Sequence, residues 1–203
     1  MPPVKLITNF YFMGGFYFLK KLLFILSFVL IFSLPAMAVT EKEFERICRS
    51  GSVQKLQTVI ANEKNFSRLR FHEMDTPLII AAKKSKNPEI LKIIIETDVD
   101  VNAQNEDGES ALIEIMDEPI NLECVKVLLS NGADPNLKDE DGKTALMKAL
   151  DDDLPADVIN ALLDSGADVK AKDRKGRDIF HYAKKAYSLH GTDTMKRLEA
   201  MAK

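Results

Sequence analysis

Apolar and polar positions recur at a fixed interval from about residue 41 onward. One apolar position of this pattern holds Leu78, Leu112, Leu146 and Phe180, which are equally spaced along the chain. The clearest copy reads NGADPNLKDEDGKTALMKAL at residues 131–150, and related passages begin one interval earlier at Thr97 and one interval later at Ser165. Self-similarity at a fixed period is typical of repeat proteins, so the pattern predicts stacked copies of one small unit.

Each copy predicts a turn followed by two helices. Asp-Gly pairs at 107–108 and 141–142 supply the glycine that a tight turn with positive φ favours. A hydroxyl residue then stands where a helix N-cap accepts hydrogen bonds from free backbone donors, and a proline in the following loop ends the first helix. The predicted N-caps are Thr76, Ser110 and Thr144. The second helix is amphipathic, and the left-handed residue that ends it falls at Asp98, Gly132 and Gly166.

Three short motifs carry a resemblance to the ankyrin repeat over residues 41–203. They are DTPLIIAA from Asp75, NGADPN from Asn131 and SGADVK from Ser165. The resemblance implies an all-α fold, an ankyrin-repeat α-solenoid of helix-turn-helix units with short β-hairpin fingers along one edge. Neighbouring units then share one core, because no unit buries its apolar face alone. The expected domain is 39–203, with an N-terminal cap repeat at 41–74, full repeats at 75–108, 109–142 and 143–176, and a C-terminal cap repeat at 177–203.

The N-terminal segment has the pattern of a secretory signal peptide. Lys20 and Lys21 precede an apolar run at 22–34, which ends near the small-residue site Ala36-Met37-Ala38. We expect cleavage after Ala38, a periplasmic or secreted location, and no membrane association of the mature chain. The alternative is an uncleaved membrane anchor, although a spanning helix needs roughly 20 apolar residues. Met13 is an alternative start of the chain.

The charge balance argues against a nucleic-acid partner. The whole chain has 28 basic and 31 acidic residues. Removal of 1–38 takes away Lys5, Lys20 and Lys21 and no acid, which leaves 25 basic residues against 31 acidic ones. Nucleic-acid binding depends on a basic face that neutralises phosphates, so a net acidic chain does not favour it.

The residues that usually carry catalysis or bind metals are few and scattered. His72, His181 and His190 have no metal-ligand spacing on a shared helix, and no catalytic constellation stands out. Cys48 and Cys124 lie two repeats apart in the register, too far for a disulfide, so we expect two buried apolar side chains. His181 falls on the histidine of the ankyrin motif, where a structural hydrogen bond near the helix start is expected. The sequence predicts no enzyme, no cofactor and no metal site.

Acidic residues gather where the resemblance places partner contacts. Ankyrin repeats usually bind partners through the finger tips and the exposed face of the first helix, and the second and third repeats present nine carboxylates and one lysine there. Basic residues follow in the last repeat. The candidate partner-binding residues are Glu106, Asp107, Glu109, Asp117, Glu118, Glu140, Asp141, Asp151, Asp152, Arg174 and Lys175. Such an acidic stripe predicts a protein partner with a basic surface, bound in a salt-dependent manner.

These features favour an exported bacterial protein-protein interaction module that acts as a monomer. Two alternatives remain open at this point. One is an inhibitor or immunity protein that blocks an exported toxin or enzyme, and the other is a membrane-anchored scaffold with an uncleaved N-terminal segment. For any single carboxylate of the acidic stripe, the simplest interpretation is a solvated side chain that contacts no partner.

Overall fold

The computed structural model describes residues 39–117 and 119–203, and the predicted signal peptide lies outside them. Within these residues the helices come in consecutive pairs. The first helices are α2 (Glu41–Ser50), α4 (Pro77–Lys84), α6 (Ala111–Glu114), α8 (Ala145–Asp151) and α10 (Ile179–Ala183). The second helices are α3 (Val53–Asn62), α5 (Pro88–Ile95), α7 (Leu122–Ser130), α9 (Ala156–Asp164) and α11 (Asp193–Ala202). Single 3₁₀ turns are η1 (Phe66–Arg68), η2 (His72–Met74) and η3 (Tyr187–Leu189).

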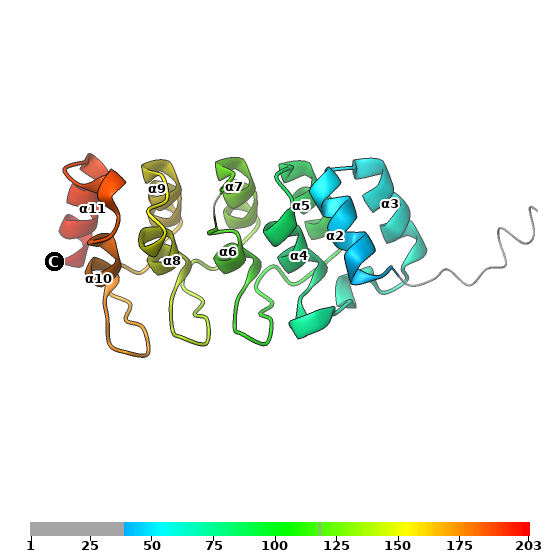
Figure 1. The fold of residues 1–203 in the computed structure, drawn as a ribbon, viewed down its shortest axis with the longest axis horizontal. Helices are drawn as coiled ribbons and strands as arrows, with labels where there is room; N and C mark the ends of the chain where they lie inside the picture. Colours follow the sequence, from blue (N-terminus) through cyan, green and yellow to red (C-terminus); the bar gives the residue numbers. More distant parts are fainter. Residues whose placement is uncertain (1–38, 118) are drawn as a thin grey trace, which may run out of the picture. The chain divides into compact units, whose positions relative to one another are not determined.

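The pairs stack into a two-layered solenoid, which confirms the predicted all-α fold class. First helices contact first helices in the order α2, α4, α6, α8, α10, and second helices contact second helices from α3 to α11. Figure 1 shows the two rows, with the connecting finger loops along the lower edge. In the first four pairs the two helices pack against each other as well as against the neighbouring repeat, so the core is continuous along the stack.

Helix starts and ends follow the predicted capping residues. The side chains of Thr76, Ser110 and Thr144 accept hydrogen bonds from the backbone N–H three residues later, at 3.1, 3.4 and 3.3 Å. At the other end of the repeat, Gly132 and Gly166 have a φ of 87° and end the second helices in the left-handed region. Asp98 takes the same place with a φ of 66°. These caps satisfy backbone groups that the short helices leave unpaired.

The repeat register also governs burial. Leu78, Leu112 and Leu146 are almost completely buried beneath the following repeat. Phe180 holds the same position in the last described repeat and is half-buried. Cys48 on α2 and Cys124 on α7 are buried thiols, and burial raises their pKa values to about 12 and about 11. Neither thiol is therefore in the reactive thiolate form at neutral pH.

Asparagine side chains join successive repeats on the side of the second helices. The side-chain amide of Asn102 donates to the carbonyl of Gly132 at 3.0 Å, and its oxygen accepts from the backbone N–H of Asp134 at 2.8 Å. Asn136 makes the same two bonds to the next repeat, to Gly166 at 3.1 Å and from Asp168 at 2.7 Å. One side chain at each of these junctions thus satisfies two backbone groups of its neighbour.

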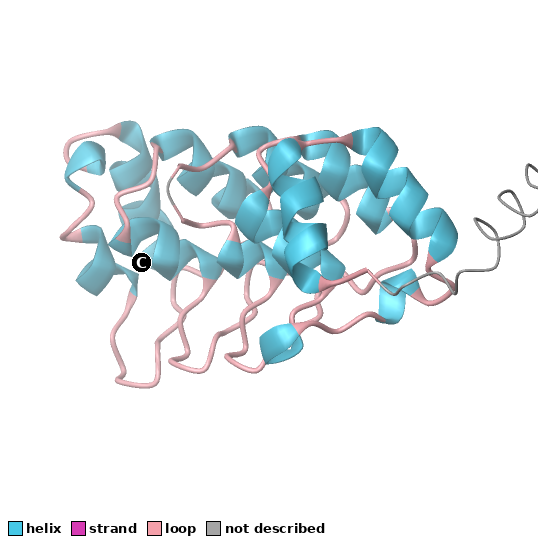
Figure 2. Cartoon of the chain, turned by 45° about the vertical axis from the view of Figure 1, so that its right-hand side comes forward, coloured by secondary structure: helices cyan, strands magenta, loops and turns pink. Residues whose placement is uncertain are grey.

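The fingers differ from the predicted β-hairpins. Figure 2 shows the second, third and fourth fingers as loops, and pairing in the described residues is limited to one bridge, between Gln104 and Ser110. The physical reason is a side-chain acceptor at the base of each of these three fingers. Asn105 accepts from the backbone N–H groups of Asp107 at 3.1 Å and Glu109 at 2.9 Å, so these donors are satisfied without a second strand. Asp139 and Asp173 stand at the same position in the next two fingers.

The first finger has a different backbone from the later ones. Met74 stands where the later fingers have a turn glycine, and Glu73 and Met74 have φ values of 59° and 60° within η2. The predicted structural hydrogen bond of the His181 side chain is not found among the described residues. The His181 side chain is exposed, and its ring packs edge-on against Tyr182 at 5.2 Å. Asp178 caps the helix start instead, by accepting from the backbone N–H of His181 at 3.2 Å.

Candidate partner-binding face

The finger tips form a continuous row because each finger is hydrogen-bonded to the next. One backbone N–H at each tip donates to a carbonyl of the preceding finger, at 2.8–2.9 Å. The three pairs are Glu106 to Glu73, Glu140 to Asp107, and Arg174 to Asp141. Loops that brace one another in this way present their side chains with little freedom of the backbone, which lowers the ordering cost of binding.

The third and fourth fingers are in especially close contact at Gly142. This glycine has a φ of 78°, and a Cβ atom built on it would lie 2.7 Å from the backbone nitrogen of Arg174. Gly176 has a similar φ of 74°, but a Cβ atom there would meet open space. Gly142 is therefore required for both its backbone conformation and its packing, whereas Gly176 is required for conformation alone.

Six predicted site residues lie at these tips with exposed side chains. In residues 39–117 and 119–203, their side chains make no ion pair and no hydrogen bond, so nothing in the described fold neutralises them. Four are acidic and lie in the second and third fingers, and two are basic and lie in the fourth. They are Glu106, Asp107, Glu140, Asp141, Arg174 and Lys175.

The predicted acids nearer the first helices are placed differently, because lysines contact them. Nζ of Lys148 lies 3.3 Å from Glu109 and 3.5 Å from Asp117. Asp151 lies 3.1 Å from Nζ of Lys143 and also pairs with Lys185. These three carboxylates are paired with lysines of the fold and are therefore less available to a partner than the tip residues.

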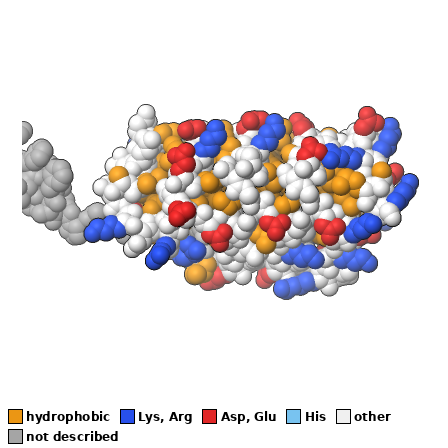
Figure 3. Space-filling view, turned by 180° about the vertical axis from the view of Figure 1, so that it is seen from behind, with side chains coloured by type: hydrophobic (Ala, Val, Ile, Leu, Met, Phe, Trp, Pro, Cys, Tyr) orange, Lys and Arg blue, Asp and Glu red, His pale blue; other side chains and the backbone are white. Residues whose placement is uncertain are grey.

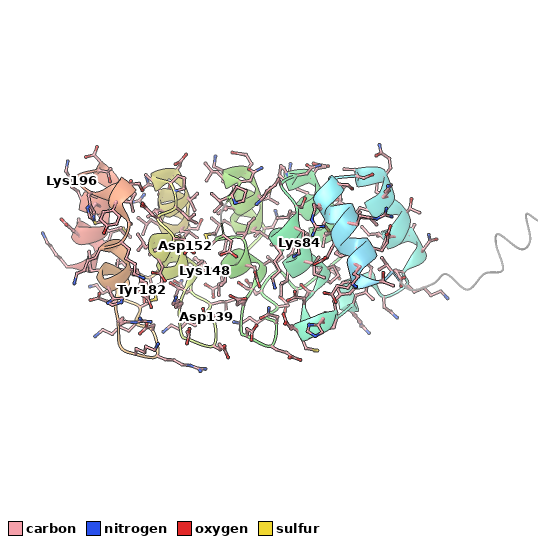
Figure 4. All side chains as sticks on the ribbon, in the orientation of Figure 1. Lys84, Asp139, Lys148, Asp152, Tyr182 and Lys196 are labelled. Atoms are coloured by element: carbon pink, nitrogen blue, oxygen red, sulfur yellow. The ribbon has the colours of Figure 1, made fainter. Side chains whose placement is uncertain are left out.

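Asp152 and Glu118 complete the predicted set. Asp152 is exposed at the C-terminal end of α8, and partial burial together with the neighbouring carboxylates of Asp117 and Asp151 raises its pKa above the ordinary value. Glu118 lies outside the described residues. Figure 4 shows Asp152 beside Lys148 on α8, above the finger that holds Asp139.

Lysine-carboxylate pairs cross every junction between neighbouring first helices of the described repeats. They tie α4 to α2, α6 to α4, α8 to the second finger, and Lys185, two residues after α10, to α8. The pairs are Lys84–Glu45 at 3.2 Å, Lys83–Glu114 at 2.7 Å, Lys148–Glu109 at 3.3 Å, and Lys185–Asp151. Glu114 and Lys148, which occupy the same position in two consecutive repeats, are not among the residues predicted from the sequence. A charged residue at an otherwise apolar position of the first helix was the signal that could have revealed them.

Glu114 and Glu109 form a carboxyl pair at the centre of this network. Only 4% of Glu114 is exposed, and its Oε1 lies 2.7 Å from Nζ of Lys83. Burial, followed by the contact with Glu109, raises the pKa of Glu114 to about 7. Burial also opposes the ionisation of Glu109, but the hydrogen bond from Glu114 and the charge of Lys148 hold its pKa below the ordinary value.

The base of the fourth finger is held by a second buried acid. Asp173 is 6% exposed and accepts hydrogen bonds from the Tyr182 hydroxyl at 2.6 Å and from Nε of Arg177 at 2.5 Å. Burial opposes its ionisation, but these bonds hold the pKa of Asp173 well below its usual range. The Tyr182 ring also lies beneath Lys143, whose Nζ is 5.4 Å from the ring centroid. This cluster fixes the finger that carries Arg174 and Lys175.

Charge is strongly segregated along the chain. Residues 97–164 contain 18 acidic and 4 basic residues, whereas residues 165–203 contain 5 acidic and 10 basic ones. Figure 3 shows Lys and Arg side chains gathered at the C-terminal end of the lower edge. The repeats therefore have an acidic centre beside a basic C-terminal end.

Within the described residues, no helix is both long and apolar enough to cross a bilayer. A comparison with curated proteins found no match for this chain. The family model for ankyrin repeats (3 copies) matches residues 45–139, 78–173 and 117–196, which together span most of the chain. Ankyrin repeats are generally non-enzymatic modules of protein-protein interaction. The chain belongs to the ankyrin-repeat family.

Proposed function

We propose that this protein is an exported protein-protein interaction module that binds a basic segment of its partner across the second and third finger tips. The observation that carries the proposal is the row of four tip carboxylates, on loops braced by backbone hydrogen bonds, without a neutralising contact in the described fold. These carboxylates are Glu106, Asp107, Glu140 and Asp141. Neighbouring repeats lie on the order of 10 Å apart, so a segment that contacts both tips spans about that distance.

The fourth finger gives the partner a preferred direction. Arg174 and Lys175 adjoin the acidic tips and repel the cationic segment that those tips attract. A partner with a basic stretch followed by acidic residues satisfies the whole row in one orientation only. Exposed charges contribute about 0–1 kcal/mol per pair. The tips therefore set the association rate and the orientation more than the total affinity.

Export is the second part of the proposal. It is supported by the basic, apolar and small-residue pattern of residues 1–38, which predicts cleavage after Ala38 and a periplasmic or secreted protein. The intact mass of the protein purified from its own cells tests this point. A mass that begins at Val39 supports export with cleavage, and a mass that includes residues 22–38 supports the membrane-anchored scaffold instead.

The binding proposal is tested by capture with matched variants. Wild-type protein and a variant with Glu106, Asp107, Glu140 and Asp141 changed to lysine are used as bait against the periplasmic and secreted fractions, at low and high salt. The control variant carries four lysine substitutions at exposed acids on the second-helix side, Glu89, Glu96, Glu123 and Asp157. Circular dichroism establishes that all three proteins are folded.

The expected result is one basic protein that binds the wild type and the control at low salt, elutes at high salt, and is lost with the finger-tip variant. Equal capture by the finger-tip variant and the wild type at low salt would show that these carboxylates are not the binding face. Loss with both variants would show that general negative charge, rather than the finger tips, attracts the partner.

A further inference from the structure

The carboxyl pair of Glu109 and Glu114 lies where three repeats meet. Glu114 is the last residue of α6, which has 4 residues against 8 in α4 and 7 in α8. Glu109 is at the base of the second finger, immediately before the N-cap Ser110. Lys83 approaches the pair from α4, and Lys148 approaches it from α8.

The charged groups around the pair do not balance it. From the first repeat, Lys83 faces Glu114 at 2.7 Å and also contacts Asp75 at 3.2 Å. From the third repeat, Lys148 faces Glu109 at 3.3 Å, and it shares its charge with Asp117 at 3.5 Å. The charged residues of α7, Glu123 and Lys126, pair with each other at 2.9 Å on its exposed surface. Two lysines therefore face four carboxylates.

We propose that Glu109 and Glu114 share one proton in the folded protein, which makes the junction of the first three repeats sensitive to pH near neutrality. With one proton in the pair, a single hydrogen bond joins the two carboxyl groups and one negative charge is shared between them. Loss of that proton places two negative charges side by side in a site where Glu114 has almost no access to water. The shortest first helix of the described repeats then carries an uncompensated charge at its end.

The sign of the effect follows from linkage. The ordinary pKa of a glutamate is 4.5, and in the folded protein the pKa of Glu114 is raised to about 7. Between these values the folded protein keeps a proton that the unfolded chain has lost, so this group lowers stability as pH rises through the window. Above about pH 7 both states have lost the proton, and the contribution becomes constant.

The test uses the full chain and the variant Glu114→Gln, which keeps the size of the side chain and cannot ionise. The matched control is Glu123→Gln, an exposed glutamate of the same repeat whose side chain is 65% exposed. Urea unfolding of all three proteins is measured between about pH 5 and pH 8. The folding constant of wild type relative to Glu114→Gln is expected to fall at least about tenfold over this range, because one pKa unit corresponds to a factor of ten. The ratio of wild type to Glu123→Gln should stay constant.

A second measurement covers the case in which the variant fails to fold. The carboxyl ¹³C resonance of Glu114 is followed against pH in the wild type, with hydrogen exchange of the α6 amides measured in parallel. We expect a midpoint well above 4.5 and faster exchange in α6 as pH passes that midpoint, after correction for the intrinsic exchange rate. A Glu114 midpoint near 4.5, or a pH-independent ratio of wild type to Glu114→Gln, would overturn the proposal.

Discussion

Nζ of Lys148 lies 3.3 Å from Oε1 of Glu109, so the first helix of the third repeat is tied to the finger base of the second. Both side chains are mostly buried, with 18% and 22% of their surfaces exposed. The same ammonium group reaches Asp117 at 3.5 Å. One lysine thus holds two carboxylates of the neighbouring repeat, and the acidic stripe expected from the sequence is partly neutralised within the fold.

The substitution Lys148→Met tests this tie. It removes the cation and keeps the apolar stem, so Glu109 loses its partner in a poorly solvated site, and the exposed Asp117 loses a nearby cation. We expect a loss of about 1–2 kcal/mol in the free energy of unfolding, measured by urea titration. The matched change Lys126→Met breaks an exposed pair with Glu123 and should cost less than about 0.5 kcal/mol. Equal losses in the two variants would contradict the role given to Lys148.

Close contact between the third and fourth fingers gives a second prediction. Gly142→Ala and Gly176→Ala place the same methyl group at similar φ values, 78° and 74°. Both variants have a strained left-handed backbone that costs about 1 kcal/mol, but only the alanine at 142 meets a backbone atom, 2.7 Å away. We expect Gly142→Ala to be less stable than Gly176→Ala by a further 1–3 kcal/mol or so, as measured by thermal unfolding. A result in which both variants are equally stable would mean that the fingers are not packed against each other.

The buried acid of the fourth finger gives a pH-dependent prediction. Tyr182→Phe removes the hydroxyl that donates to Asp173 at 2.6 Å, and we expect a loss of about 1–2 kcal/mol at neutral pH. The pKa of Asp173 is held below its ordinary value of 3.8, so its stabilising contribution is present above that pH and is lost as pH falls through the folded-state value. The difference between wild type and variant should therefore narrow below about pH 4 in urea titrations. A difference that is constant down to pH 2.5 or so would show that Asp173 is not the partner that matters.

Much of the fold follows from local sequence signals. Thr76, Ser110 and Thr144 cap the first helices, and Gly132 and Gly166 end the second ones, as the repeat pattern predicts. Caps and positive-φ glycines depend on a few neighbouring residues, so one sequence is sufficient to recognise them. The finger geometry was less predictable. In the structure the Asn105 side chain accepts hydrogen bonds from two backbone N–H groups of its finger. The sequence alone does not show whether a side chain or a second strand accepts these bonds.

The candidate site was predicted in part. The sequence places Glu106, Asp107 and Glu140 at exposed tips because they adjoin the turn glycines, and the structure finds them there. It does not reveal that Lys148 reaches Glu109, because that contact joins residues 39 apart in the chain through the stacking of two helices. Pairing between repeats depends on side-chain length and direction, which the register alone does not specify. Only the structure separates tip acids from internally paired ones.

The association rate of the captured partner, measured against salt concentration, shows whether the finger-tip carboxylates attract it. We expect kon for the wild type to fall on the order of tenfold or more between about 50 and 500 mM salt, while koff changes little. The variant with four lysines at the finger tips should have a low kon even at the lowest salt concentration, and its kon should depend little on salt. The variant with lysines at Glu89, Glu96, Glu123 and Asp157 should stay closer to the wild type. A kon that is independent of salt, or equal in the wild type and the finger-tip variant, would contradict the account.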